Sequence, residues 1–321
     1  MGALTLDVVE EAFDETSPLA KTFAVLVIQS GEVVLERYAD AFYRFDGSSA
    51  PLGPETLLPG WSMAKSVLHA LVGILVADGA LGLESRADVP EWVSSDDPRR
   101  EITLRDLLEM RDGLRFVEDY EDGEKSDVIE MLFGSGKDDV SRFASDRDPV
   151  AKRGERFNYS SGTTNIISGM VARIVGRGER YREFMRSRLL DPLEMTSAEP
   201  GFDKSGVWVA SSFLDATAMD FARFGLLYLN GGRVGGRQVV PEDWIATAYV
   251  PRSRDGSDGS YYSVHWWVEC DGRETIRCGG YGGQSITVCP SLDLVMVRLG
   301  SSPESSYPDL ASWRERVLAA F

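Results

Sequence analysis

The chain has 321 residues, 43% of them hydrophobic, and 51 acidic against 34 basic side chains give a formal net charge of −17 at pH 7. A chain of this size buries a full core and forms one large domain or two intermixed ones. The acidic balance has no basic cluster to offset it, and this argues against nucleic acid as a partner, because binding to phosphate depends on lysine and arginine.

The sequence predicts neither a secretory signal nor a membrane span. The first basic side chain is Lys21, so no basic segment precedes an apolar one at the N-terminus. The longest apolar run, Val67 to Ala77, is far shorter than the roughly 20 residues of a spanning helix. We therefore expect a soluble cytoplasmic protein without membrane contact. The three cysteines lack C-x-x-C spacing, which predicts reduced thiols and no zinc site.

Strands are predicted at both ends of the chain and helices in the middle. The stretch FAVLVIQSGEVVLERY, residues 23–38, has β-branched residues on both sides of Ser30-Gly31 and predicts a hairpin. Helical patterns follow from Ser62 to about Arg188, including TLRDLLEMRDGL with Thr103 as its N-cap. The segment DATAMDFARFGLLYLNGG predicts an amphipathic helix with Asp215 near its cap.

The C-terminal part returns to strands and ends in a helix. Strands are predicted in SVHWWVEC, ETIRCGG, SITVCP and LDLVMVRLG, and a helix over residues 311–320. We therefore predict an α+β fold, with one antiparallel sheet built from both termini, flanked by helices, and an inserted, mostly helical subdomain. The predicted boundaries are residues 1–60 plus 205–321 for the sheet domain and residues 61–204 for the insertion, with a ligand site between them.

The stretch GWSMAKSVLH, residues 60–69, carries the first candidate for chemistry. On a helix that begins near Ser62, Lys65 lies one turn further on the same face, within hydrogen-bond reach. A lysine desolvated at the start of a buried helix has a lowered pKa and can act as base for a serine nucleophile. The alternative is that Ser62 only caps the helix, since an S-x-x-K pattern alone occurs by chance in many proteins.

A Ser-His-Asp triad is a weaker explanation of Ser62. GWSMA departs from the G-x-S-x-G pattern at Ala64, and the chain has only two histidines. His265 lies in an aromatic run that predicts a buried strand, and His69 falls two turns along the helix of Ser62. Lysine is therefore the better candidate for the base.

Two further stretches determine the interpretation. FNYSSGTTN contains Tyr159 followed by Ser160 and Ser161, and CGGYGGQS is a glycine-rich turn before a strand. S-x-x-K, then Y-S-x, then a glycine-rich strand entry, in this order and on this plan, resembles the serine β-lactamase and penicillin-binding-protein superfamily. The chain is most similar to the class C-related branch with family VIII esterases, D-aminopeptidase-like enzymes and 6-aminohexanoate-dimer hydrolases. The resemblance covers nearly the whole chain.

The resemblance implies roles for individual residues. Ser62 would be the acylated nucleophile, Lys65 would take its proton or hold Tyr159 in its reactive state, and Tyr159 would act as general base and acid. The backbone N–H groups of Ser62 and Gln284 would form the oxyanion hole. No metal or other cofactor is implied.

Two departures from the β-lactamases concern the substrate. Tyr281-Gly282-Gly283 is interpreted as replacing a Lys-Thr-Gly triplet, and Ser161 as replacing an asparagine, so efficient β-lactam turnover is doubtful. The remaining candidates for substrate contact come from an acidic loop and an aromatic pair, with a solvated loop and a buried core as equally good explanations. They are Glu118, Asp119, Tyr120, Trp266 and Trp267.

These observations predict a metal-independent serine hydrolase that cleaves a small ester or amide, with an ester favoured. An amidase acting on linear amides, D-amino acid peptides or 6-aminohexanoate oligomers is the first alternative, because an acidic wall at Glu118 and Asp119 would suit a free amine. A sensor that acylates without turnover is the second alternative. The sequence gives no indication of the oligomeric state.

Overall fold

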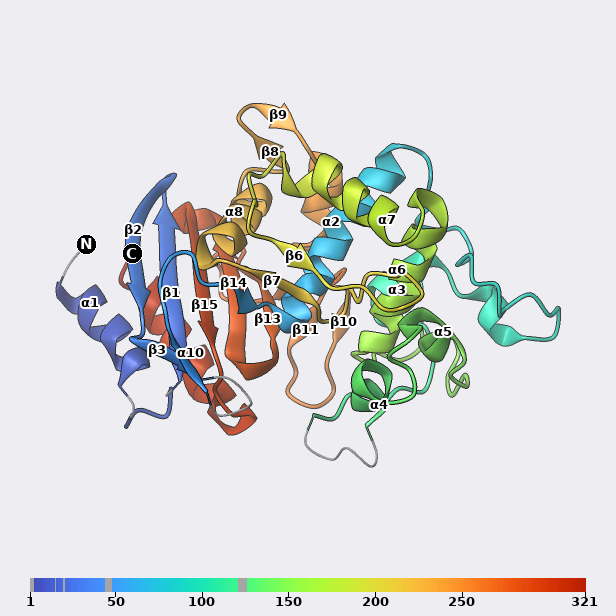
Figure 1. Cartoon of the computed structure of the whole chain (residues 1–321), viewed down its shortest axis with the longest axis horizontal. Coiled ribbons are helices and arrows are strands. Elements are labelled where there is room, and N and C mark those ends of the chain that lie inside the picture. Colours follow the sequence, from blue (N-terminus) through green and yellow to red (C-terminus); the bar gives the residue numbers. More distant parts are fainter. Residues whose placement is uncertain (1–2, 15, 20, 44–47, 121–125) are drawn as a thin grey trace.

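The protein is described here from a computed structural model that covers residues 3–14, 16–19, 21–43, 48–120 and 126–321 (Figure 1). Its main sheet is antiparallel throughout, in the order β10-β11-β12-β13-β14-β15-β1-β2. The strands are Thr22–Gln29 (β1), Glu32–Tyr38 (β2), Ser253–Arg254 (β10), Tyr261–Tyr262 (β11), Trp267–Val268 (β12), Ile276–Gly280 (β13), Gln284–Cys289 (β14) and Leu294–Gly300 (β15). Because β1 pairs with β15, both ends of the chain complete one sheet, and the predicted α+β fold class is confirmed.

The side chains of β1 alternate between two cores, as the period of two in a strand requires. Ala24, Leu26 and Ile28 belong to the main core, while Val25 and Val27 face a second, smaller one. Both faces of this strand are therefore buried, which explains why its sequence is continuously apolar.

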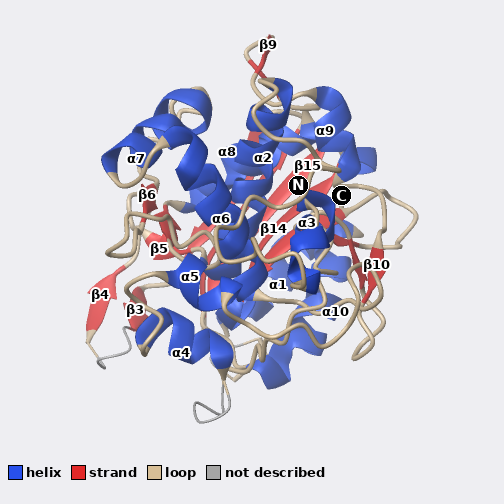
Figure 2. Ribbon diagram, turned by 90° about the vertical axis from the view of Figure 1, so that its right-hand side faces the viewer, coloured by secondary structure: helices blue, strands red, loops and turns tan. Residues whose placement is uncertain are grey.

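Helices cover both faces of the sheet (Figure 2). The main core holds α8 (Ala218–Leu229), which packs on β14, β15 and β1, and the buried helix α2 (Ala64–Ala77). The smaller core lies under α1 (Ala3–Glu10) and α10 (Tyr307–Leu318), where Trp313 packs. Figure 1 shows most of the other helices gathered beyond α2, away from β1 and β2.

Apart from one helix of 15 residues, Ser161–Val175, the remaining elements of the described chain are short. The helices are Leu104–Leu108 (α3), Asp127–Phe133 (α4), Val140–Ser145 (α5), Ser161–Val175 (α6), Glu179–Met185 (α7) and Glu242–Thr247 (α9). The strands outside the main sheet are Ala41–Tyr43 (β3), Ser49–Pro51 (β4), Leu58–Pro59 (β5), Glu199–Pro200 (β6), Leu214–Ala216 (β7), Arg233–Val234 (β8) and Arg237–Gln238 (β9).

Local signals in the sequence explain several element boundaries. Ser30 and Gly31 have φ angles of 50° and 80°, the left-handed conformation that a two-residue hairpin turn needs. Thr103 caps α3 in a capping box with Asp106, as the sequence predicts.

The predicted helix after Asp215 is present, and its cap is Thr217, two residues after Asp215, which itself lies in strand β7. One strand prediction was largely wrong. The segment SVHWWVEC contributes only Trp267–Val268 to the sheet, since His265 has a φ of 63° that interrupts the extended backbone.

Within the described ranges, none of the helices has the length and apolar character needed to cross a membrane. The cytoplasmic location and the domain boundaries at residues 60/61 and 204/205 stay predictions.

Candidate active site

The backbone that carries Ser62 is tightly fixed. Residues Trp61–Met63 form one 3₁₀ turn that leads directly into α2, and Trp61 has a left-handed φ of 47°. Gly60 donates a hydrogen bond to the Leu214 carbonyl in β7 at 2.9 Å. A Cβ on Gly60 would lie only 2.8 Å from the Phe221 ring, so a side chain there would displace α8 or this turn. The unusual conformation before Ser62 is therefore held by its surroundings.

Lys65 lies in the interior and points its amine at Ser62. Its Nζ donates hydrogen bonds to Ser62 Oγ at 2.8 Å, to Ser161 Oγ at 3.0 Å and to the Ser211 carbonyl at 3.0 Å. Burial lowers the pKa of Lys65 to about 8, and the negative charge of Glu118 partly opposes this effect. A substantial fraction of Lys65 is therefore neutral near physiological pH, when its lone pair can accept the Ser62 proton.

Tyr159 approaches the same atoms from the start of α6. Ser160 caps this helix by accepting a hydrogen bond from the Thr163 N–H at 3.0 Å, which fixes the preceding tyrosine. The Tyr159 ring centroid lies 4.9 Å from Lys65 Nζ, and the ring stacks on Trp267. Burial raises the pKa of Tyr159, as does the charge of Glu118, while a hydrogen bond with Ser62 lowers it. The phenol therefore keeps its proton at neutral pH.

Glu118 anchors the hydrogen-bond network around the amine. Its Oε2 accepts the Ser161 N–H at 2.7 Å, and its Oε1 accepts the Ser161 hydroxyl at 2.5 Å and also the Tyr120 hydroxyl. Lys65 is thus connected to a carboxylate through Ser161, without a direct ion pair. Glu118 was expected to belong to an acidic wall that binds a substrate amine. Its carboxylate instead accepts hydrogen bonds from protein donors, so it is not free for such an amine.

Tyr120 and Tyr281 lie beside the nucleophile. Their ring centroids are 5.2 Å apart. Burial raises the pKa of Tyr120, while a hydrogen bond with Ser62 lowers it. Both rings line a cavity of about 370 Å³ together with Ser62. The rest of its lining is mostly apolar and comes from α4 and neighbouring segments: Trp61, Val128, Ile129, Leu132, Phe133 and Ser212.

Two predicted substrate contacts are not at this cavity. Trp266 is 0% exposed and packs on Phe224 and Tyr228 in the main core, so the prediction that it contacts substrate does not fit the structure. The adjacent Trp267 is the tryptophan that lies against Tyr159. Asp119 does not line the cavity of Ser62, and its carbonyl accepts a hydrogen bond from Ser126.

The glycine-rich segment meets Ser62 at a different residue from the predicted one. A Cβ on Gly280 would lie 2.4 Å from the Gly60 carbonyl oxygen and 3.2 Å from the Ser62 nitrogen. Only glycine therefore lets the end of β13 approach the nucleophile so closely. A Cβ on Gly282, by contrast, would meet Gly300, Ser301 and the Gln284 side chain. A Cβ on Gly283 would meet Arg298 and Leu310.

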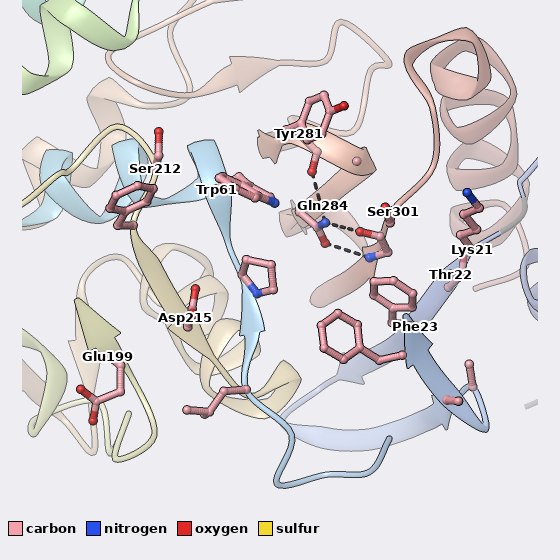
Figure 3. Close-up of a pocket in the computed structure, with 18 of the residues that line it drawn as sticks. Lys21, Thr22, Phe23, Trp61, Glu199, Ser212, Asp215, Tyr281, Gln284 and Ser301 are labelled. Carbon is pink, nitrogen blue, oxygen red and sulfur yellow. Dashed lines mark hydrogen bonds between the residues drawn. The ribbon is translucent and has the colours of Figure 1, made fainter. Parts of the chain in front are cut away.

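The predicted oxyanion donor Gln284 is likewise not supported. Gln284 pairs with Gly280 as the last pair of the β13–β14 ladder, and its side chain forms hydrogen bonds with the backbone of Gly300 and Tyr281 (Figure 3). Tyr281, which directly follows Gly280, has no hydrogen bond to its N–H among the described residues. This N–H is the better partner for that of Ser62.

Arg298 fixes the turn that follows Gly280 and was not predicted from the sequence. It is 1% exposed and donates to the Gly282 carbonyl at 2.8 Å, to Thr22 and to Ser302. Burial lowers its pKa to about 9. A charged group in the interior of an apolar strand, VMVRL, is the sequence signal that could have pointed to this role.

Neither histidine serves Ser62. His265 forms hydrogen bonds with Thr164 and the Leu108 carbonyl, both at 3.0 Å, and burial lowers its pKa to about 3. His69 bonds Tyr228 at 2.7 Å and stacks on Trp244. Both imidazoles are structural, which leaves Lys65 and Tyr159 as the groups next to the serine.

The Beta-lactamase family model matches residues 17–321 of this chain. The chain belongs to the β-lactamase family. A 6-aminohexanoate-dimer hydrolase of Paenarthrobacter ureafaciens is 29% identical over 339 residues, which cover 97% of this chain and 79% of that protein. The chain also shares its fold with solved structures whose sequences are less than 20% identical to its own.

One of these is a penicillin-binding protein homologue from Caulobacter crescentus, with a TM-score of 0.76 and 19% identity over 99% of this chain and 97% of that one. Another is a family VIII carboxylesterase, with a TM-score of 0.74 and 14% identity over 98% and 96% of the two chains. The resemblance inferred from the motifs is confirmed.

The close approach of Gly280 can be tested by substitution. Gly280→Ala places a methyl group against the Ser62 N–H, so we expect the rate of Ser62 labelling by a fluorophosphonate, followed by intact mass, to fall about a hundredfold. Gly279→Ala is the matched control, because the only tight contact of its Cβ would be with the flexible end of Arg277. Equal rates in the two variants would contradict the assignment of Gly280.

The lowered pKa of Lys65 predicts the pH dependence of the same reaction. The neutral amine is the base, so the labelling rate should rise with pH through about 8. Glu118→Gln removes the charge that raises the pKa of Lys65, and its midpoint should move to lower pH. Asp119→Asn, the neighbouring charge deletion, should leave the midpoint in place. A midpoint that does not respond to Glu118→Gln would refute this role of Glu118.

Proposed function

We propose that this β-lactamase family protein is a serine hydrolase that cleaves a small ester through an acyl-enzyme at Ser62. The observation that carries the proposal is the hydrogen bond of 2.8 Å from the buried Lys65 amine to Ser62 Oγ, combined with a Lys65 pKa lowered to about 8. A serine hydroxyl needs such a base to attack a carbonyl carbon.

The geometry supports the following steps. Ser62 Oγ attacks the carbonyl carbon and gives up its proton to neutral Lys65, directly or through Tyr159. The carbonyl oxygen becomes an oxyanion that the N–H groups of Ser62 and Tyr281 stabilise. Tyr159, protonated at neutral pH, donates a proton to the departing alkoxide and is reprotonated from Lys65. Water then attacks the acyl group by the same route and releases the acid.

The position of Ser161 favours an ester over an amide. Its hydroxyl donates to Glu118 and accepts from Lys65, so it has no remaining proton for a substrate carbonyl. An asparagine at this position in the β-lactamases supplies an amide that orients the substrate's own amide. The segment nearest Ser62, Cys278-Gly279-Gly280, also has no cationic side chain for an antibiotic carboxylate, so β-lactam turnover stays doubtful.

A linear amide is the second candidate. It is supported by the 29% identity to a 6-aminohexanoate-dimer hydrolase over almost the whole chain. The engaged carboxylate of Glu118 argues against binding of a free amine beside Ser62. A sensor that acylates once without turnover is the remaining alternative, and steady turnover excludes it.

The cavity of Ser62 indicates an apolar acyl group. Ile129 and Leu132 of α4 line it, and its volume of about 370 Å³ is sufficient for a short acyl chain. No carboxylate or basic side chain lines this cavity among the described residues.

The proposed nucleophile is tested by turnover of p-nitrophenyl acetate and butyrate together with fluorophosphonate labelling. We expect steady hydrolysis and a single adduct in the intact mass, both lost in Ser62→Ala. Removal of the nucleophile costs a factor of about 10⁶ in comparable enzymes, so the variant should be indistinguishable from buffer. Labelling without turnover would favour the sensor, and turnover in Ser62→Ala would remove Ser62 from the mechanism.

Acyl-chain selectivity tests the apolar cavity. Ile129→Phe fills part of the space, so the ratio of kcat/KM for p-nitrophenyl hexanoate to that for the acetate should fall about tenfold. Ile174→Phe makes the same change at an exposed position near the end of α6 and should leave the ratio as it is. An unchanged ratio in Ile129→Phe would show that the acyl chain lies elsewhere.

A further inference from the structure

A second and larger cavity, of about 1380 Å³, adjoins the cavity of Ser62 (Figure 3). The two share Trp61, Ser212 and Tyr281 in their lining, so they meet beside the nucleophile. Ser62 lines the small cavity and is absent from the lining of the large one. In an acyl-enzyme the acyl group is bonded to Ser62 Oγ and must occupy that small cavity. The part of the substrate that departs is therefore left to the large cavity.

The large cavity combines an apolar wall with one unpaired carboxylate. Phe23, Leu57 and Phe213 contribute apolar surface. Asp215 lies in β7, where its backbone pairs with Pro59 on one side and with Glu199 on the other, and these pairings fix its position. Partial desolvation in the cavity raises the pKa of Asp215. The wall suits an alkyl chain, and the carboxylate suits a charge at its end.

The lack of a partner distinguishes Asp215 from the other acid in the cavity. In the part of the chain that the structure describes, the Asp215 carboxylate accepts no hydrogen bond and forms no ion pair. Glu199 lies 3.6 Å from Arg186 and 3.7 Å from Arg182. The Asp215 side chain is open to the cavity, so its carboxylate is free to form an ion pair with a bound cation. Figure 3 shows Lys21 on the opposite side of the cavity.

This inference rests on the proposed function. We propose that the large cavity binds a cationic leaving group, an alcohol that carries an ammonium at the end of a short alkyl chain, with Asp215 as its counter-ion. The substrate class is then an ester of an amino alcohol with a short apolar acid. The net charge of −17 attracts such a substrate at long range. The Asp215 carboxylate then binds its ammonium group inside the cavity.

The test compares three butyrate esters of similar size. Their alcohol parts are trimethylammonio-propyl, its neutral isostere with a tert-butyl group, and carboxypropyl. We expect the wild-type kcat/KM to be about tenfold higher for the cationic ester than for the neutral one, with the anionic ester lowest. In the near-isosteric Asp215→Asn the cationic-to-neutral ratio should fall to about one. The rate of the neutral ester in the same variant reports that the protein is folded.

Glu199→Gln is the matched control, because it deletes a carboxylate of the same cavity that already has arginine partners. It should lower the ratio much less than Asp215→Asn does, because Glu199 lies opposite Asp215 but its charge is already paired. Turnover of p-nitrophenyl butyrate with equal rates for the cationic and neutral esters would overturn the inference and leave the proposed function intact. A preference for the anionic ester would overturn the inference, because Lys21 and not Asp215 would then attract the leaving group. No turnover of any ester would overturn the proposed function and this inference together.

Discussion

The chemistry of the site depends on an amine that is kept away from water. Lys65 is 1% exposed and has hydroxyl and carbonyl groups as its immediate partners, with the nearest carboxylate one serine further away. A direct ion pair would hold the proton on the amine and remove its basicity. An amine with no carboxylate nearby would be costly to bury. The indirect connection through Ser161 to Glu118 lies between these limits, and it places the titration close to neutral pH.

The surrounding structure serves this arrangement by fixing three separate segments against one another. The turn before α2 supplies the serine and the lysine, the start of α6 supplies the tyrosine, and the end of β13 supplies the glycine that approaches the serine. Each segment is held by contacts outside the reacting atoms, such as the bond from Gly60 to Leu214 and the contact of Arg298 with the Gly282 carbonyl. The site is therefore built on element ends that rigid packing positions.

Periodic and local patterns in the sequence were sufficient for much of the fold. The alternation in β1, the Ser30-Gly31 turn and the Thr103 cap depend on neighbours in the chain, and these predictions agree with the structure. The motif residues Ser62, Lys65 and Tyr159 come together as their order suggested. The predictions that failed concern residues whose roles depend on contacts between segments far apart in the chain. Gly280 is distinguished from Gly282 and Gly283 by its extended backbone and by the residues that lie opposite it. Trp266 is distinguished from Trp267 by the surroundings into which its side chain packs.

The pairing of β1 with β15 also has a consequence for the way in which the protein becomes active during synthesis. The serine and lysine leave the ribosome early, whereas β13, β14 and β15 are among the last segments to emerge. Contacts between residues so distant in the chain form slowly, because a large loop must close before they gain any free energy. Until then the Gly280 contact beside Ser62 does not exist. A nascent chain therefore carries its nucleophile without the backbone donor that follows β13, and hydrolytic activity begins only when the last strands have joined the first.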